Sequence, residues 1–175
     1  MQRWSKLNEL GTSAANKLVN LQLQKEYHAV EGTSTLALAN DQDSAFKLQE
    51  EITKASQELS TIYGSLANLH TKMDALVQSF HAIRNLKALQ RYNEDSSDNQ
   101  IFSTWTIEHF CDVSQRLFDS FTKELSLKER LVMEFTRCRN RDELMVYLSL
   151  WLHEPLLDDD NDVLLESMLI EAELR

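Results

Sequence analysis

Residues that could carry out chemistry are few, and their spacing fits no catalytic site. The three that lie closest together are His109, Cys111 and Asp112, whose types suit nucleophilic catalysis. Neighbouring positions on a helix point in different directions, so these side chains would not hydrogen-bond one another. The three glycines stand alone, which argues against a phosphate-binding loop, and the sequence contains no H-E-x-x-H motif. No metal-ligand spacing links the histidines, which are His28, His70, His81, His109 and His153.

An acidic run near the C-terminal end has the spacing that opens a calcium-binding loop. It consists of Asp158, Asp160 and Asp162. Such a loop needs glycine at its sixth position and a bidentate glutamate at its twelfth, where this sequence has Val163 and Leu169. We therefore interpret the run as the solvated start of a helix. We expect a protein that is not an enzyme and that holds no metal or other cofactor.

Large apolar side chains gather near the C-terminal end and offer binding rather than catalysis. Trp151, Leu152, Leu156 and Leu157 lie within seven residues of one another, and a second apolar run covers 164–169. Two interpretations stay open. These side chains either cover the core of the protein's own helices or form a docking surface, where tryptophan and methionine are favoured anchors.

The composition favours helices and disfavours binding to nucleic acid or membranes. The 175 residues include three glycines and one proline, too few for a sheet with many tight turns. The net charge is −10, and residues 154–175 supply −7 of it through eight acids and one arginine. Such a surface disfavours nucleic acid and anionic lipid, and no apolar run is long enough to span a bilayer. Two cysteines without a C-x-x-C pair indicate a reducing compartment.

The strongest pattern is a run of apolar residues spaced alternately by four and three positions. Over five heptads this spacing is typical of a coiled-coil seam, so we predict one helix over 44–92, roughly 70 Å long. The seam is filled within the chain, by a second copy or by another protein, and the pattern leaves these alternatives open. The seam residues are Leu48, Ile52, Ala55, Leu59, Ile62, Leu66, Leu69, Met73, Leu76, Phe80 and Ile83.

Four further helices complete the predicted fold. The first spans 3–24 and is followed by a loop over 25–43 that contains Gly32. A polar loop over 93–103 precedes a third helix, which starts near 104–106, where a threonine hydroxyl can cap it. The fourth opens with a capping box at Asn140 and stops before Pro155, and the last carries 163–169. We expect an all-α, elongated helical bundle with a short C-terminal helical cap and with two regions, 1–92 and 104–175.

Short runs of residues across 105–171 follow the order and nearly the spacing of a known family. On these residues the chain resembles the cyclin-dependent kinase 2-interacting protein family. A weaker match covers Trp4, Leu7, Asn8, Ala15, Asn16, Asn20 and Leu21. The residues of the main match are Trp105, His109, Phe110, Val113, Ser114, Lys123, Glu124, Leu125, Leu127, Lys128, Tyr147, Leu148, Ser149, Trp151, Leu152, His153, Pro155, Leu165, Glu166, Ser167, Met168, Leu169 and Glu171.

The resemblance implies a non-enzymatic adaptor. In the first of two roles that it implies, the protein is a subunit of a chromatin-associated remodelling complex that acts in replisome proteostasis and pre-60S ribosome maturation. Its partners there would be AAA+ ATPase subunits and a second small coiled-coil protein. The alternative is a scaffold that links cyclin-dependent and other replication kinases to origin firing and DNA-damage checkpoint factors. The implied location is the nucleus, with the cytoplasm left open. The only proline follows Glu154, so no Ser-Pro or Thr-Pro site exists for a proline-directed kinase.

As docking residues within the matched runs, we single out the aromatic, apolar, histidine and proline side chains. These are Trp105, His109, Phe110, Tyr147, Trp151, His153, Pro155, Leu165, Met168 and Leu169.

Overall fold

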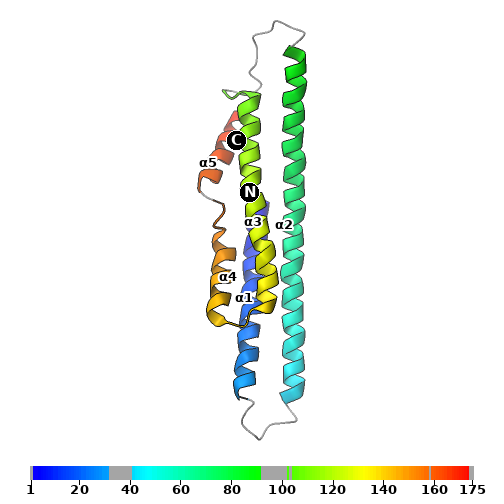
Figure 1. Ribbon diagram of the computed structural model, residues 1–175, viewed down its shortest axis with the longest axis vertical. Helices are drawn as coiled ribbons and strands as arrows, with labels where there is room; N and C mark the ends of the chain where they lie inside the picture. Colours follow the sequence, from blue (N-terminus) through cyan, green and yellow to red (C-terminus); the bar gives the residue numbers. More distant parts are fainter. Residues whose placement is uncertain (1, 32–40, 92–101, 103, 158, 174–175) are drawn as a thin grey trace. The chain divides into compact units, whose positions relative to one another are not determined.

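A computed structural model describes residues 2–31, 41–91, 102, 104–157 and 159–173 (Figure 1). These residues form five helices and no strand, which confirms the predicted all-α class. The helices are α1 (Gln2–Glu31), α2 (Asp41–Arg91), α3 (Ile107–Arg137), α4 (Arg141–His153) and α5 (Asp159–Glu171). Among the described residues, no helix combines the length and the apolarity that crossing a bilayer requires.

The first two helices extend beyond their predicted ends. We predicted a loop over 25–43, but α1 continues to Glu31 and α2 begins at Asp41. The apolar period is lost after Gln24, yet no glycine or proline occurs between Gln24 and Gly32. Residues with adequate helix propensity can extend a helix that packing has already nucleated. The rest of the predicted loop, 32–40, lies outside the described residues, as do most of the predicted loop over 93–103 and Asp158.

The two ends of α4 show how local chemistry sets a helix boundary. At its start, the Asn140 side chain accepts a hydrogen bond of 2.9 Å from the backbone N–H of Asp142, which confirms the predicted cap. At its end, Glu154 adopts left-handed backbone angles, φ 45° and ψ 59°. Pro155 follows directly and disfavours right-handed helix at the residue before it, so α4 cannot continue.

The described helices form two compact units. Unit 1 comprises Met1–Ala67 and Ser126–Glu154, and unit 2 comprises Asn68–Leu125 and Pro155–Arg175. The core of unit 1 contains Trp4, Ala14, Ala15, Leu18, Val19, Leu48, Ala55, Leu59, Leu66, Leu131, Phe135, Leu144 and Trp151. The core of unit 2 contains Val77, Ile107, Phe110, Cys111, Val113, Leu117 and Phe121. The predicted division into a coiled-coil region, 1–92, and a C-terminal helical region that completes the bundle, 104–175, stays a prediction.

The seam residues of α2 fall into two groups. In unit 1, Leu48, Ala55, Leu59 and Leu66 are buried and Ile52 and Ile62 are half-buried. In unit 2, Leu69, Met73 and Phe80 are half-buried, whereas Leu76 and Ile83 are exposed. Val77 is buried there instead, eleven residues and three helical turns after Leu66. A straight helix drifts by about 20° per heptad against a strict seven-residue repeat, so the buried face leaves the predicted seam. Pairing of α2 with a second protein stays a prediction.

Candidate functional site

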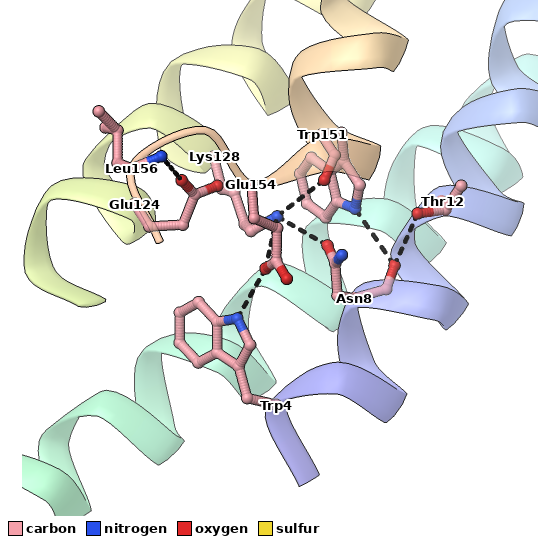
Figure 2. Close-up of polar contacts among 8 residues, drawn as sticks. All are labelled: Trp4, Asn8, Thr12, Glu124, Lys128, Trp151, Glu154 and Leu156. Carbon is pink, nitrogen blue, oxygen red and sulfur yellow. Dashed lines mark hydrogen bonds and ion pairs between the residues drawn. The ribbon is translucent and has the colours of Figure 1, made fainter. Parts of the chain in front are cut away.

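A fully buried ammonium group lies at the centre of unit 1. Lys128 on α3 has no exposed surface, and its Nζ lies 2.7 Å from Asn8 Oδ1, 3.1 Å from the Trp151 carbonyl oxygen and 3.2 Å from Glu154 Oε1 (Figure 2). An ammonium carries three donors, so these three acceptors satisfy it completely. The charge also lies 4.6 Å from the centroid of the Trp151 ring, on its face.

The carboxylate of Glu154 joins this cluster to the start of the chain. Its Oε1 accepts a hydrogen bond of 2.7 Å from Trp4 Nε1, in addition to the ion pair with Lys128 (Figure 2). The left-handed backbone of Glu154 costs energy for a residue with a Cβ and is kept only where its surroundings hold it. Here the two inward contacts of the carboxylate provide that support. We name Trp4, Asn8, Lys128, Trp151 and Glu154 the Lys128 cluster.

Trp151 is a core residue and not a docking anchor. Its side chain is fully buried, and its Nε1 faces the backbone carbonyl of Asn8 at 3.4 Å. A Cβ added at Gly11 would lie 2.5 Å from Cζ2 of the indole, so the ring occupies the space that a side chain on α1 would need. Of the two interpretations left open for the apolar residues around Trp151, the structure supports the core for the tryptophan itself.

A second polar cluster in unit 2 ties α5 to the residues before α3. The carboxylate of Glu171 accepts hydrogen bonds from the backbone N–H groups of Thr104, at 2.7 Å, and Trp105, at 3.0 Å, and from the Thr104 hydroxyl. The Thr104 hydroxyl contributes most to lowering the pKa of Glu171, followed by the two backbone donors, and His109 adds a smaller effect. We name Thr104, Trp105 and Glu171 the Glu171 cluster. Thr104 therefore binds α5. The hydroxyl oxygen of Thr106 accepts a hydrogen bond of 3.2 Å from the backbone N–H of His109 at the start of α3.

The other predicted docking residues differ in exposure. Phe110 is buried, with its ring 5.0 Å from Phe80 and 4.2 Å from Phe102 between centroids. Trp105 is half-buried, edge-on to His109 at 4.5 Å. Tyr147, Leu165 and Met168 are half-buried, and the exposed members are His109, His153, Pro155 and Leu169. Tyr147, Trp151 and His153 belong to unit 1 and the others to unit 2, and docking through the exposed members stays a prediction.

Four of the exposed large apolar side chains of unit 2 lie on α2. They are Leu76, Ile83, Leu86 and Leu89, with exposed fractions of 60, 44, 62 and 68 %. We name them the α2 stripe. Leu76 and Ile83 belong to the predicted seam, whereas Leu86 and Leu89 lie outside it. Leu86 follows Ile83 by three positions, whereas the alternation of the predicted seam requires four and falls on Lys87.

His70 and His81 each bond within unit 2 and not to one another. His70 stacks on Phe118 at 4.5 Å, and its Nε2 lies 2.8 Å from Thr122 Oγ1. Burial lowers its pKa, and Asp74 opposes this effect. His81 Nε2 lies 3.1 Å from Gln115 Oε1. Within the described part of the chain, no three side chains of the histidine, cysteine, aspartate and glutamate types converge to hold a metal ion.

Comparison with known proteins connects this arrangement to a family. The chain is 32 % identical to the human cyclin-dependent kinase 2-interacting protein over 173 residues, which are 97 % of this chain and 81 % of the relative. The mouse protein of that name is 30 % identical over the same shares. The Xenopus laevis protein is 30 % identical over 98 % of this chain and 82 % of its own length. This chain belongs to the cyclin-dependent kinase 2-interacting protein family. No family model matches it.

Membership in the cyclin-dependent kinase 2-interacting protein family confirms the resemblance drawn from the sequence. Four residues on which that resemblance rested, Trp4, Asn8, Lys128 and Trp151, meet in the Lys128 cluster. A fifth, Glu124, accepts a 3.2 Å hydrogen bond in unit 2 from the backbone N–H of Leu156 (Figure 2). These five matching residues thus hold helices in place.

Proposed function

We propose that the protein is a non-enzymatic interaction protein whose helices bind other proteins, a cyclin-dependent kinase among them. The observation that carries the proposal is the similarity to relatives that are named for interaction with cyclin-dependent kinase 2, across nearly the whole chain. The polar side chains support it as well. Lys128 and Glu171 bond to backbone groups and neighbouring side chains, as structural residues do.

Two finer roles follow from the resemblance to the family. In the first, the chain is an adaptor subunit in a chromatin-associated complex of AAA+ ATPases with a second small coiled-coil protein, acting in replisome proteostasis and pre-60S ribosome maturation. In the second, it is a scaffold that links cyclin-dependent and other replication kinases to origin firing and the DNA-damage checkpoint. Either role places the protein in the nucleus. The relatives' name favours the second role.

Affinity purification of the tagged full chain from its own cells, followed by mass spectrometry, tests the proposal. Recovery of a cyclin-dependent kinase supports it, and binding of the purified chain to the purified kinase establishes a direct contact. Recovery of AAA+ ATPases together with a second small coiled-coil protein would select the remodelling role. If no kinase is recovered and the purified proteins do not bind, the kinase-linked proposal is wrong.

A further inference from the structure

The α2 stripe starts at the edge of a helix face that is already occupied and continues to the outer side of the helix. Val77 is buried in unit 2, and the Phe80 ring packs edge-on against Phe110. His81 bonds to Gln115 from the same inner side. Leu76 and Ile83 lie next to Phe80 on the helix surface, at the edge of this occupied face, and Leu86 lies on the far side of the helix. The apolar surface of α2 therefore extends beyond the part that the chain's own described helices cover.

The shape of the stripe suits a single helix. Leu76, Ile83 and Leu86 occupy a and d positions of one heptad register, and Ser79 fills the d position between Leu76 and Ile83. Ala75 and Ala82 are exposed beside them, at positions where small side chains let a second backbone approach closely. Leu89 extends the same edge by one more turn. A narrow ridge of three large side chains bordered by small ones matches one partner helix.

The charge beside the stripe has the sign opposite to that of the whole protein. Over 68–89, α2 carries Lys72, Arg84 and Lys87 against one acid, Asp74, a net +2 in a chain of −10. Lys72 lies on the stripe, four residues before Leu76, and Lys87 flanks it beside Leu86. Flanking charges of a helical seam select the partner by opposite charge.

We propose that the α2 stripe binds an amphipathic helix of another protein, with apolar residues at its a and d positions and acidic residues flanking them. The inference deepens the proposed interaction role and rests on it, because it assigns a surface to a partner of stated chemistry. A second copy of this chain would present the same basic stripe, so charge favours a different protein. The acidic surface of the chain as a whole opposes anionic lipid.

The test uses the full chain and two synthetic three-heptad peptides. Both peptides carry leucine at a and d, and they differ only in having glutamate or lysine at e and g. Fluorescence anisotropy should detect binding of the acidic peptide, with the basic peptide at least about tenfold weaker. The double variant I83D/L86D should lose this binding. Met133→Asp, at an equally exposed apolar position on α3 in unit 1, should retain it.

A charge reversal keeps the test decisive if I83D/L86D does not fold. K72E/K87E leaves the apolar residues intact and should reverse the preference of the chain between the two peptides, so that the basic peptide binds better. The proposal is overturned if the two peptides bind equally, if neither binds, or if the reversal leaves the preference unchanged. It is also overturned if sizing shows a dimer that I83D/L86D dissolves, or if the chain sediments with phosphatidylserine vesicles through the stripe. No kinase takes part, so the result is independent of the kinase-linked proposal.

Discussion

The indole ring of Trp151 lies against the backbone of Gly11, so closely that a Cβ at Gly11 would be 2.5 Å from Cζ2 and 2.8 Å from Nε1. The contact joins α4 to α1 within unit 1, beside the Lys128 cluster. Glycine normally weakens a helix interior, and here the missing side chain is what lets a buried tryptophan enter.

Gly11→Ala should therefore destabilise the protein, although alanine is the better helix former. The added Cβ must displace a fully buried ring, and overpacking of this kind costs about 1–3 kcal/mol. Gly64→Ala is the matched control, because nothing lies within 4 Å of its Cβ position and the same exchange should stabilise α2 by about 0.5–1 kcal/mol. Urea unfolding curves measure both. Equal effects of the two exchanges would contradict the close contact.

Lys128→Met should cost about 3–5 kcal/mol of unfolding free energy, because removing one partner of a buried ion pair leaves the other charge and its acceptors unsatisfied. Adding Glu154→Gln removes the stranded charge and should recover part of the loss. The free energies of unfolding of the two single variants and the double variant form a cycle that measures the coupling. A purely additive double variant would mean that the pair does not act as a unit.

Glu171 should make the attachment of α5 sensitive to acid. Because the hydrogen bonds from Thr104 and Trp105 lower its folded-state pKa, its contribution is fully present above the ordinary value of 4.5. It is lost as the pH falls through the lower, folded-state pKa. Hydrogen exchange of α5 amides against pH should show this loss in the natural chain and not in Glu171→Gln. Glu173→Gln, at an exposed position two residues away, should keep the natural profile.

Asn140→Ala should destabilise α4 by about 1 kcal/mol, since the backbone N–H of Asp142 loses its side-chain acceptor at the helix start. Arg139→Ala changes the neighbouring exposed position and should have a much smaller effect. Thermal unfolding of the two variants side by side measures the difference. A drop of the same size in both would place the effect outside the cap.

The helices and their boundaries were the most predictable part of this protein. Scarce glycine and proline, the cap at Asn140 and the stop before Pro155 are local signals, and each acts within a few residues of itself. The family could also be predicted from the sequence, because its matching residues lie in order along the chain. The α1–α2 connection was misjudged for the same reason, since a lost apolar period is not a helix stop when no breaking residue accompanies it.

Long-range partners were decided by tertiary structure alone. Nothing near Lys128 in the sequence indicates that a lysine mid-helix is fully buried, because its acceptors come from Asn8, Trp151 and Glu154 on other segments. The same holds for the seam. Its spacing predicted one apolar face over five heptads, but an α-helix turns once in 3.6 residues, and the packing of each unit determined which leucines that face buries. Leu66 is covered within the chain, while Leu76 and Ile83 are exposed, and the periodicity does not distinguish the two cases.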